Sequence, residues 1–316
     1  MIVPLLSFLI AGAAPEPPAD PWGAAAPERQ CSGRVCVEVE DQVPRFLAFW
    51  DAAQAHPPAD ADARFALWKE KYGFAAVPPG PRGQEMARRL LDQAWARYPA
   101  AVAALRTRGT PDPAPLDSLA RVARLLDFDQ PLTVKVVYFV GGFEGNAFAY
   151  AMGDMPVVNF PVEAGTNRAV EQAHELTHAV HTRLAGLSGG WERSIAQTLL
   201  QEGLAMHVSR EAVPGLPVAA YVTHKPEWWA AAQARKAAIL ADVMASLEAK
   251  DGASVYRQTI GQGASGLTRQ AYAAGWWVVE DMRAHGMTLA QIARIPPERI
   301  IPAVRKSMVR ISSSAS

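Results

Sequence analysis

The segment Ala173-His174-Glu175-Leu176-Thr177-His178-Ala179-Val180-His181 holds two histidines four residues apart, with a glutamate directly after the first. On a helix, residues four apart lie on the same face, one turn above each other. His174 and His178 can therefore direct two imidazole nitrogens at one metal ion, while Glu175 can reach a water beside that ion without being a ligand. Metal-assisted hydrolysis needs two neutral nitrogen ligands, an open coordination position and a carboxylate base. The H-E-x-x-H pattern therefore predicts a zinc site on a helix.

The residues around this pattern favour a helix that buries one face and directs the two histidines elsewhere. An alternative interpretation is a surface helix with two solvated histidines. Small or apolar residues recur at helical spacing, which is typical of a face turned toward the core. They are Val170, Ala173, Thr177, Val180 and Leu184.

A catalytic zinc of this kind needs a third protein ligand, and Glu202 is the best candidate. It lies in a second predicted helix, where Ile195, Leu199, Glu202 and Met206 share one apolar face. A carboxylate there must be paired, protonated or bound to a metal, because burying a bare charge is very costly. The alternative is an ion pair between Glu202 and an arginine from elsewhere. Gly203, which has no side chain, is expected to let another helix approach closely.

Two other residues compete for the role of third ligand. His181 follows His178 by three residues, but three ligands along one unbroken helix would spread over about 10 Å, which zinc–nitrogen bonds of about 2 Å cannot span. Glu192 stands near the expected start of the Glu202 helix, where an acidic residue complements the helix dipole. Neither is preferred over Glu202.

The two motifs together resemble the gluzincin metallopeptidases, in which H-E-x-x-H is followed by a helix bearing E-G-x-A. Within them the chain is most similar to bacterial predicted zinc-dependent proteases with an E-G-L-A second motif, over roughly Val134 to Ile301. The resemblance implies that His174, His178 and Glu202 bind Zn²⁺ and that Glu175 activates water. It also implies an α+β, zincin-like fold, mostly helical, with a small antiparallel sheet preceding the metal-binding helix. The edge strand of that sheet would hold extended peptide.

The beginning of the chain predicts export. Residues 1–13 form a short apolar run ending in Ala11-Gly12-Ala13, which is typical of a signal peptide, although no Lys or Arg precedes the run. Residues 14–42 are expected to be a Pro- and Ala-rich linker. The linker contains Cys31 and Cys36, for which a small disulfide loop is the default interpretation in an exported protein. We therefore expect a periplasmic or secreted bacterial protein.

The remaining chain is expected to form a helical N-terminal subdomain, residues 43–130, and a zincin-like metallopeptidase domain, residues 131–316. The first should contain a long helix over 84–108. It either covers one wall of a substrate cleft or keeps the enzyme latent as a propeptide. The second should open with three strands over 132–160, and 145–149 is the candidate substrate-binding edge.

Gluzincins use a Tyr or His to stabilise the oxyanion that forms when water attacks a carbonyl. Tyr272 is the first candidate, because it begins a predicted helix just after the Gly-rich stretch 261–266. His224 is the second. A purely structural role is the alternative for either residue.

The formal net charge is zero, so no electrostatic field for nucleic acid or anionic membranes is visible. We expect a peptide or protein substrate, no nucleic acid, and no stable membrane insertion after signal cleavage; the oligomeric state is not predicted. The function predicted is a zinc-dependent peptidase. The alternative is a zinc-stabilised binding or assembly protein of the cell envelope whose catalysis is vestigial.

Overall fold

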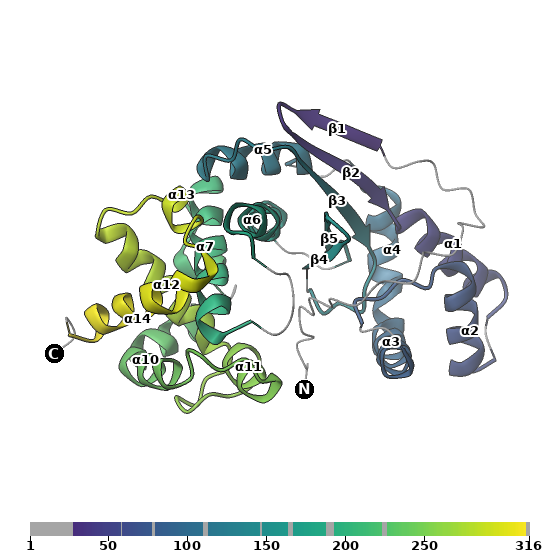
Figure 1. Cartoon of the computed structure of the whole chain (residues 1–316). Coiled ribbons are helices and arrows are strands. Elements are labelled where there is room, and N and C mark those ends of the chain that lie inside the picture. Colours follow the sequence, from purple (N-terminus) through teal and green to yellow (C-terminus); the bar gives the residue numbers. More distant parts are fainter. Residues whose placement is uncertain are drawn as a thin grey trace. The chain divides into compact units, whose positions relative to one another are not determined.

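The computed structural model of the 316-residue chain describes residues 28–57, 59–77, 80–109, 113–145, 147–163, 167–187, 193–222 and 226–313. The predicted signal peptide 1–13 and His224 lie outside the described residues. The chain forms two compact units: Met1–Pro115 with Thr133–Asn167, and Leu116–Leu132 with Arg168–Ser316 (Figure 1). In the part that is described, no helix combines the length and the apolar character needed to span a membrane.

The first unit contains a five-stranded sheet in the order β1-β2-β3-β5-β4. The strands are β1 (Glu28–Ser32), β2 (Val35–Asp41), β3 (Leu132–Phe139), β4 (Phe148–Met152) and β5 (Met155–Pro161). The stretch interpreted as a linker thus contributes a hairpin to the sheet. Val35, Cys36 and Val37 are all buried, so the first half of β2 packs into the core of this unit.

The sheet is mixed, which corrects the expectation of an antiparallel sheet. β4 and β5 pair antiparallel, with Phe148 opposite Asn159, but β5 pairs parallel with β3, with Lys135 opposite Val157. The reason is strand order. β5, and not β4, lies beside β3, and β4 lies at the edge of the sheet. Phe148 and Ala149 of the candidate substrate-binding edge do belong to an edge strand.

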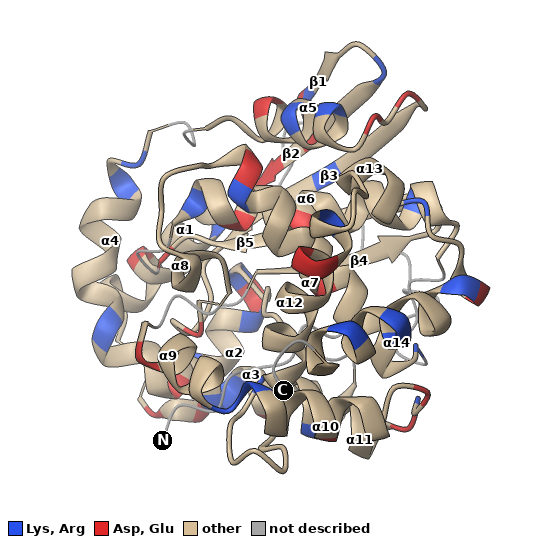
Figure 2. Ribbon diagram, turned by 90° about the vertical axis from the view of Figure 1, so that its left-hand side faces the viewer, with Lys and Arg blue, Asp and Glu red and all other residues tan. Residues whose placement is uncertain are grey.

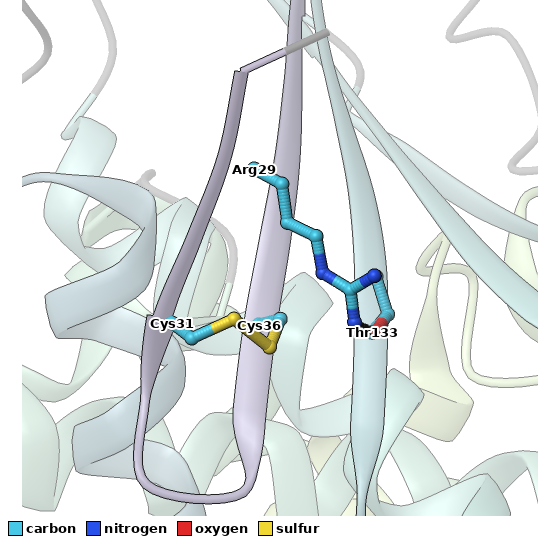
Figure 3. Close-up of a disulfide and its surroundings, with 4 residues drawn as sticks. All are labelled: Arg29, Cys31, Cys36 and Thr133. Atoms are coloured by element: carbon cyan, nitrogen blue, oxygen red, sulfur yellow. Dashed lines mark hydrogen bonds between the residues drawn. A yellow bond between two sulfur atoms is a disulfide. The ribbon is translucent and has the colours of Figure 1, made fainter.

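The hairpin β1–β2 carries the expected disulfide between Cys31 and Cys36, which stand directly opposite each other (Figure 3). Arg29 of β1 reaches across β2, and its Nη2 donates a hydrogen bond of 3.2 Å to Thr133 Oγ1 on β3 (Figure 3). The disulfide is therefore a cross-strand link within the sheet.

Helices of the first unit pack around an aromatic core. They are α1 (Val43–Ala55), α2 (Ala61–Lys71), α3 (Pro81–Ala94), the 3₁₀ turn η1 (Trp95–Arg97) and α4 (Tyr98–Arg106). The single helix expected over 84–108 is wrong, because Pro99 lacks an N–H and its ring clashes with the preceding turn. Tyr72 and Tyr98 join this core to the end of β3, donating 2.9 Å hydrogen bonds to the carbonyls of Val140 and Gly141.

The second unit is helical and is organised around α7 (Ile195–Ala212), which is almost entirely buried. A helix that packs on all sides needs small or apolar residues all round. The other helices are α5 (Pro115–Leu125), α6 (Arg168–Ala185), α8 (Val218–Val222), α9 (Pro226–Ala234), α10 (Lys236–Ala245), α11 (Gly252–Thr259), α12 (Gln270–Ala284), α13 (Leu289–Ile292) and α14 (Pro297–Ser313). Lys and Arg positions are interspersed with Asp and Glu positions along the described elements (Figure 2).

The close helix approach expected at Gly203 is confirmed, and the partner is α12. A Cβ on Gly203 would lie 2.2 Å from the carbonyl oxygen of Gly275, and a Cβ on Gly275 would lie 2.5 Å from the carbonyl oxygen of Leu199. The two backbones touch without side chains between them. This contact sets the spacing of α7 and α12 at the level of Glu202.

Replacing Gly203 by Ala should destabilise the protein by about 1–3 kcal/mol, because the added methyl group forces two backbones apart. The urea midpoint measures this effect. Gly109→Ala is the matched control, since Gly109 has open space around it. Equal midpoints for both variants would contradict the packing described.

Asp281 of α12 is held by α14: Ser307 Oγ donates a 2.6 Å hydrogen bond to it and Arg310 Nε one of 3.1 Å. Burial raises the pKa of Asp281, but the hydrogen bonds from Arg310 and Ser307 outweigh burial and lower it. A lowered pKa contributes stability above the unfolded value, about 3.9, that is lost as pH falls through the folded value.

The stability difference between wild type and Asp281→Asn should therefore be present at about pH 6 and shrink as pH falls toward 3. Urea unfolding at several pH values measures it. A difference that stays constant over this range would contradict the assignment.

Candidate metal centre

α6 carries His174, Glu175 and His178 on a half-buried face, while the predicted apolar face turns inward. Val170, Ala173, Thr177 and Val180 are all buried, and Leu184 is partly exposed. The alternative of a solvated surface helix is therefore excluded. The rings of the two histidines lie edge to face, with centroids 4.9 Å apart.

Glu202 of α7 lies beside these histidines and is only 6 % exposed. Its Oε2 is 3.2 Å from Nε2 of His174 and 3.6 Å from Nε2 of His178. The two Nε2 atoms are 3.2 Å apart. Three atoms that can each offer a lone pair to a metal thus lie around one point, an arrangement that a bound cation would stabilise.

The spacing of these three atoms fits tetrahedral zinc. Ligand atoms about 2.0–2.2 Å from a tetrahedral ion lie roughly 3.3–3.6 Å from one another. The observed separations of 3.2, 3.2 and 3.6 Å match this value. Two imidazole nitrogens and one carboxylate oxygen are also a donor set that zinc prefers. The residues present therefore fit the ion that the sequence predicts.

The histidines and glutamates of this cluster shift one another's pKa values. Burial lowers the pKa of His174, but the hydrogen bond with Glu202 and the charges of Glu202 and Glu175 outweigh burial and raise it. Burial raises the pKa of Glu202, but the charges and hydrogen bonds of His178 and His174 outweigh burial and hold it well below its usual range. Glu202 is therefore an anion at neutral pH, as a zinc ligand must be.

Glu175 differs from Glu202 in its environment. Burial raises the pKa of its carboxyl group; His174 and His178 oppose this, and Glu202 adds to it. A raised pKa is the property of a carboxyl group that can hold a proton during turnover.

Arg193, just before α7, is the arginine that the alternative interpretation of Glu202 required. Its Nη2 lies 4.0 Å from Glu202 Oε1, at the outer limit of an ion pair. Its other nitrogens donate to Thr198 Oγ1 at 3.1 Å and Gln201 Oε1 at 2.9 Å. The Oε1 atom of Glu202 thus lies nearest Arg193, while Oε2 lies nearest the two histidines.

Tyr272, at the start of α12, lies within the electrostatic field of this cluster. Burial and the charge of Glu202 raise its pKa to about 12, against opposing contributions from Arg269 and Arg193. The Gly203–Gly275 contact explains this proximity, because Tyr272 is one helical turn before Gly275. The second oxyanion candidate, His224, and the rival ligand Glu192 lie outside the described residues.

His181 is not part of the group of ligand atoms that the described residues bring together. It is fully buried and neither ring nitrogen has a hydrogen-bond partner among the described residues. Burial, with the charges of His178 and Arg193, lowers its pKa to about 3, so its ring is neutral.

Sequence reasoning missed Arg193 and Arg269. No spacing rule marks either residue, because a long side chain reaches a site from outside the periodic face. The available signals were local: Arg193 directly precedes Ser194, which caps α7 by accepting a 3.1 Å hydrogen bond from Gln197 N. Arg269 stands three residues before Tyr272.

A separate hollow of about 380 Å³ opens near the other end of α7 and α12. Its lining includes His207, Arg210 and Arg283, and none of the predicted metal ligands. The candidate metal site is therefore defined by its donor atoms and not by the size of a cavity.

Comparison with known families agrees with this chemistry. Residues 154–302, just under half of the chain, match a family described as "Predicted Zn-dependent protease (DUF2268)". The matched range includes α6, α7 and α12. Neither the curated proteins nor the solved structures gave a match. The family match supports a zinc-dependent protease.

Replacing Glu202 by Ala should weaken zinc binding by more than the 10- to 100-fold typical of residues that only support a ligand. Competition with a chromophoric chelator measures the affinity. Glu211→Ala is the matched control, because Glu211 is an exposed carboxylate of the same helix, paired with Arg283 at 2.8 Å. Equal affinities in the two variants would remove Glu202 from the ligand set.

Proposed function

We propose that this chain is a zinc-dependent peptidase with a zincin-like fold, in which His174, His178 and Glu202 hold the ion. The observation that carries the proposal is the convergence of three ligand atoms at 3.2–3.6 Å. The family description over residues 154–302 supports the same chemistry. When bound, zinc supplies Lewis acidity toward a substrate carbonyl and an acidified water.

Glu175 is the proposed general base. It follows His174 directly, so its carboxylate stands beside the metal ligands without joining them. It accepts a proton from the attacking water and passes it to the leaving amine of the cleaved peptide bond. Its partly buried setting, which raises its pKa, favours both steps, because a carboxyl group that is too acidic would hold the proton poorly.

Tyr272 is the proposed donor to the oxyanion that develops on the attacked carbonyl. A pKa of about 12 keeps its phenol protonated at neutral pH, so the hydroxyl can donate a hydrogen bond. His224 remains the second candidate for this role.

We propose a peptide or protein as substrate and a site of action outside the cytoplasm. The cross-strand disulfide Cys31–Cys36 supports the second point, since disulfides persist in oxidising compartments. The apolar run at residues 1–13 points the same way.

Glu175→Gln should retain zinc and lose about 10²- to 10⁴-fold in turnover, the usual contribution of a general base. Hydrolysis of a quenched fluorescent peptide library, measured with zinc content, tests this. Glu171→Gln, a change at a buried glutamate of the same helix, is the control for folding. Full turnover by Glu175→Gln would refute the assigned base. Zinc binding without hydrolysis in the wild type would favour the vestigial binding protein.

A further inference from the structure

Arg269 stands directly before α12 in a backbone conformation that is uncommon for a residue with a side chain. Its φ is 58°, in the left-handed region, and it occupies the position that precedes the first turn of the helix. Such conformations cost free energy and persist where the surrounding structure enforces them, often at functional sites. The conformation fixes where the Arg269 side chain leaves the backbone.

The surroundings that enforce this conformation are a network of polar groups around the next residue. Gln270 is fully buried; its Nε2 donates to Gln258 Oε1 at 2.6 Å and also to Asp242 Oδ2, and its Oε1 accepts from Ser265 Oγ at 2.7 Å. Ala264 N donates to Asp242 Oδ2 at 3.0 Å. The loop 261–269 is therefore tied to α10 and α11, and Arg269 is presented from a fixed support.

The guanidinium of Arg269 lies over the ring of Tyr272, with Cζ 3.9 Å from the ring centroid. Tyr272 in turn lies in the field of Glu202 and Glu175. The charge of Arg269 also reaches the metal cluster, where it lowers the pKa of His174 against the larger effect of Glu202. A cation is thus held at the side of the metal centre where Tyr272 stands.

This cation has no anionic partner within the described part of the chain. No carboxylate there lies within ion-pair distance of Arg269, and its Nε is buried without a hydrogen-bond partner. Arg193, on the same cluster, has contacts with Thr198, Gln201 and Glu202 instead. A partly buried guanidinium with an unsatisfied N–H is costly unless a ligand supplies the acceptor.

We propose that Arg269 binds a carboxylate group of the peptide substrate beside the scissile bond, and so acts as a specificity-determining residue. This inference rests on the proposed function. A guanidinium is planar and matches a carboxylate with paired N–H donors. The carboxylate is either the C-terminus of the peptide or an acidic side chain near the cleavage site. The first source would make the enzyme a carboxypeptidase, and the second an endopeptidase that prefers acidic residues.

The test is binding, measured by calorimetry with the zinc-loaded Glu175→Gln protein so that no cleavage occurs. Four N-acetylated peptides share one core sequence. Each has either a free or an amidated C-terminus, and each has either Glu or Gln at one internal position, so that one of the four carries no carboxylate. The Arg269→Gln change should weaken binding of a carboxylate-bearing peptide by about 10- to 100-fold, the range for a hydrogen bond to a charged group, and leave the neutral peptide unchanged. If only peptides with a free C-terminus bind more weakly to the Arg269→Gln variant, the carboxylate is the C-terminus. If only peptides with the internal Glu bind more weakly, it is the acidic side chain.

Two further variants keep this result interpretable. Arg269→Lys preserves the charge but not the paired donors and should restore part of the affinity. Arg305→Gln, which removes an exposed arginine paired with Glu248, should change nothing. Equal binding of all four peptides with and without Arg269, or no binding of any peptide to the parent protein, would overturn the inference.

Failure of the inference and failure of the proposed function are distinguishable. Zinc content and hydrolysis of the neutral peptide by a protein that keeps both Glu175 and Arg269 test the function. If the protein binds carboxylate peptides through Arg269 but hydrolyses no peptide, the proposed function is wrong and the inferred binding site stands.

Discussion

The second unit depends on one buried carboxylate. Glu202 lies in the middle of α7, a helix that is buried along almost its whole length. A bare charge at that depth would be very costly, so the positions of its neighbours are constrained by it. His174 and His178 face one oxygen and Arg193 the other. An ion at the point between the ligand atoms would complete the compensation that the protein groups begin.

The contacts around α7 fix the positions of the residues near Glu202. Ser194 caps the helix, and the glycine contact with α12 brings the start of that helix to the cluster. Tyr272 and Arg269 therefore come within electrostatic reach of the candidate ligands because of a backbone contact, one turn away, that contains no functional group. The placement of residues that would perform chemistry thus depends on residues that only set the helix spacing, as expected for a site built on rigid elements.

Local periodicity was enough to predict the parts of this site that lie on single helices. The H-E-x-x-H spacing and the apolar face of Glu202 each depend on residues within two turns, and the structure brings these side chains together as predicted. The partner helix of Gly203 could not be predicted, because nothing local indicates which distant backbone fills the space. Arg269 was missed for a related reason: the lack of an anionic partner among the described residues is visible only in the tertiary structure.

The errors in the fold have the same physical origin. Whether β5 lies next to β3 depends on non-local strand pairing, and the sequence of three strands is compatible with either order. The Cys31–Cys36 hairpin belongs to the sheet because β2 pairs with β3, which lies about a hundred residues later in the chain. The helix break at Pro99, by contrast, could have been predicted from the sequence, since a proline inside a helix ends or kinks it.

If two imidazole nitrogens and the Glu202 carboxylate hold one zinc ion, X-ray absorption at the zinc edge of the purified protein should detect all three. Two imidazole ligands and oxygen ligands at about 2.0–2.2 Å are expected, with no sulfur. One imidazole is expected in His178→Ala if any zinc is retained. Zinc without two imidazole ligands in the wild type, or no retained zinc after reconstitution, would contradict this set of ligands.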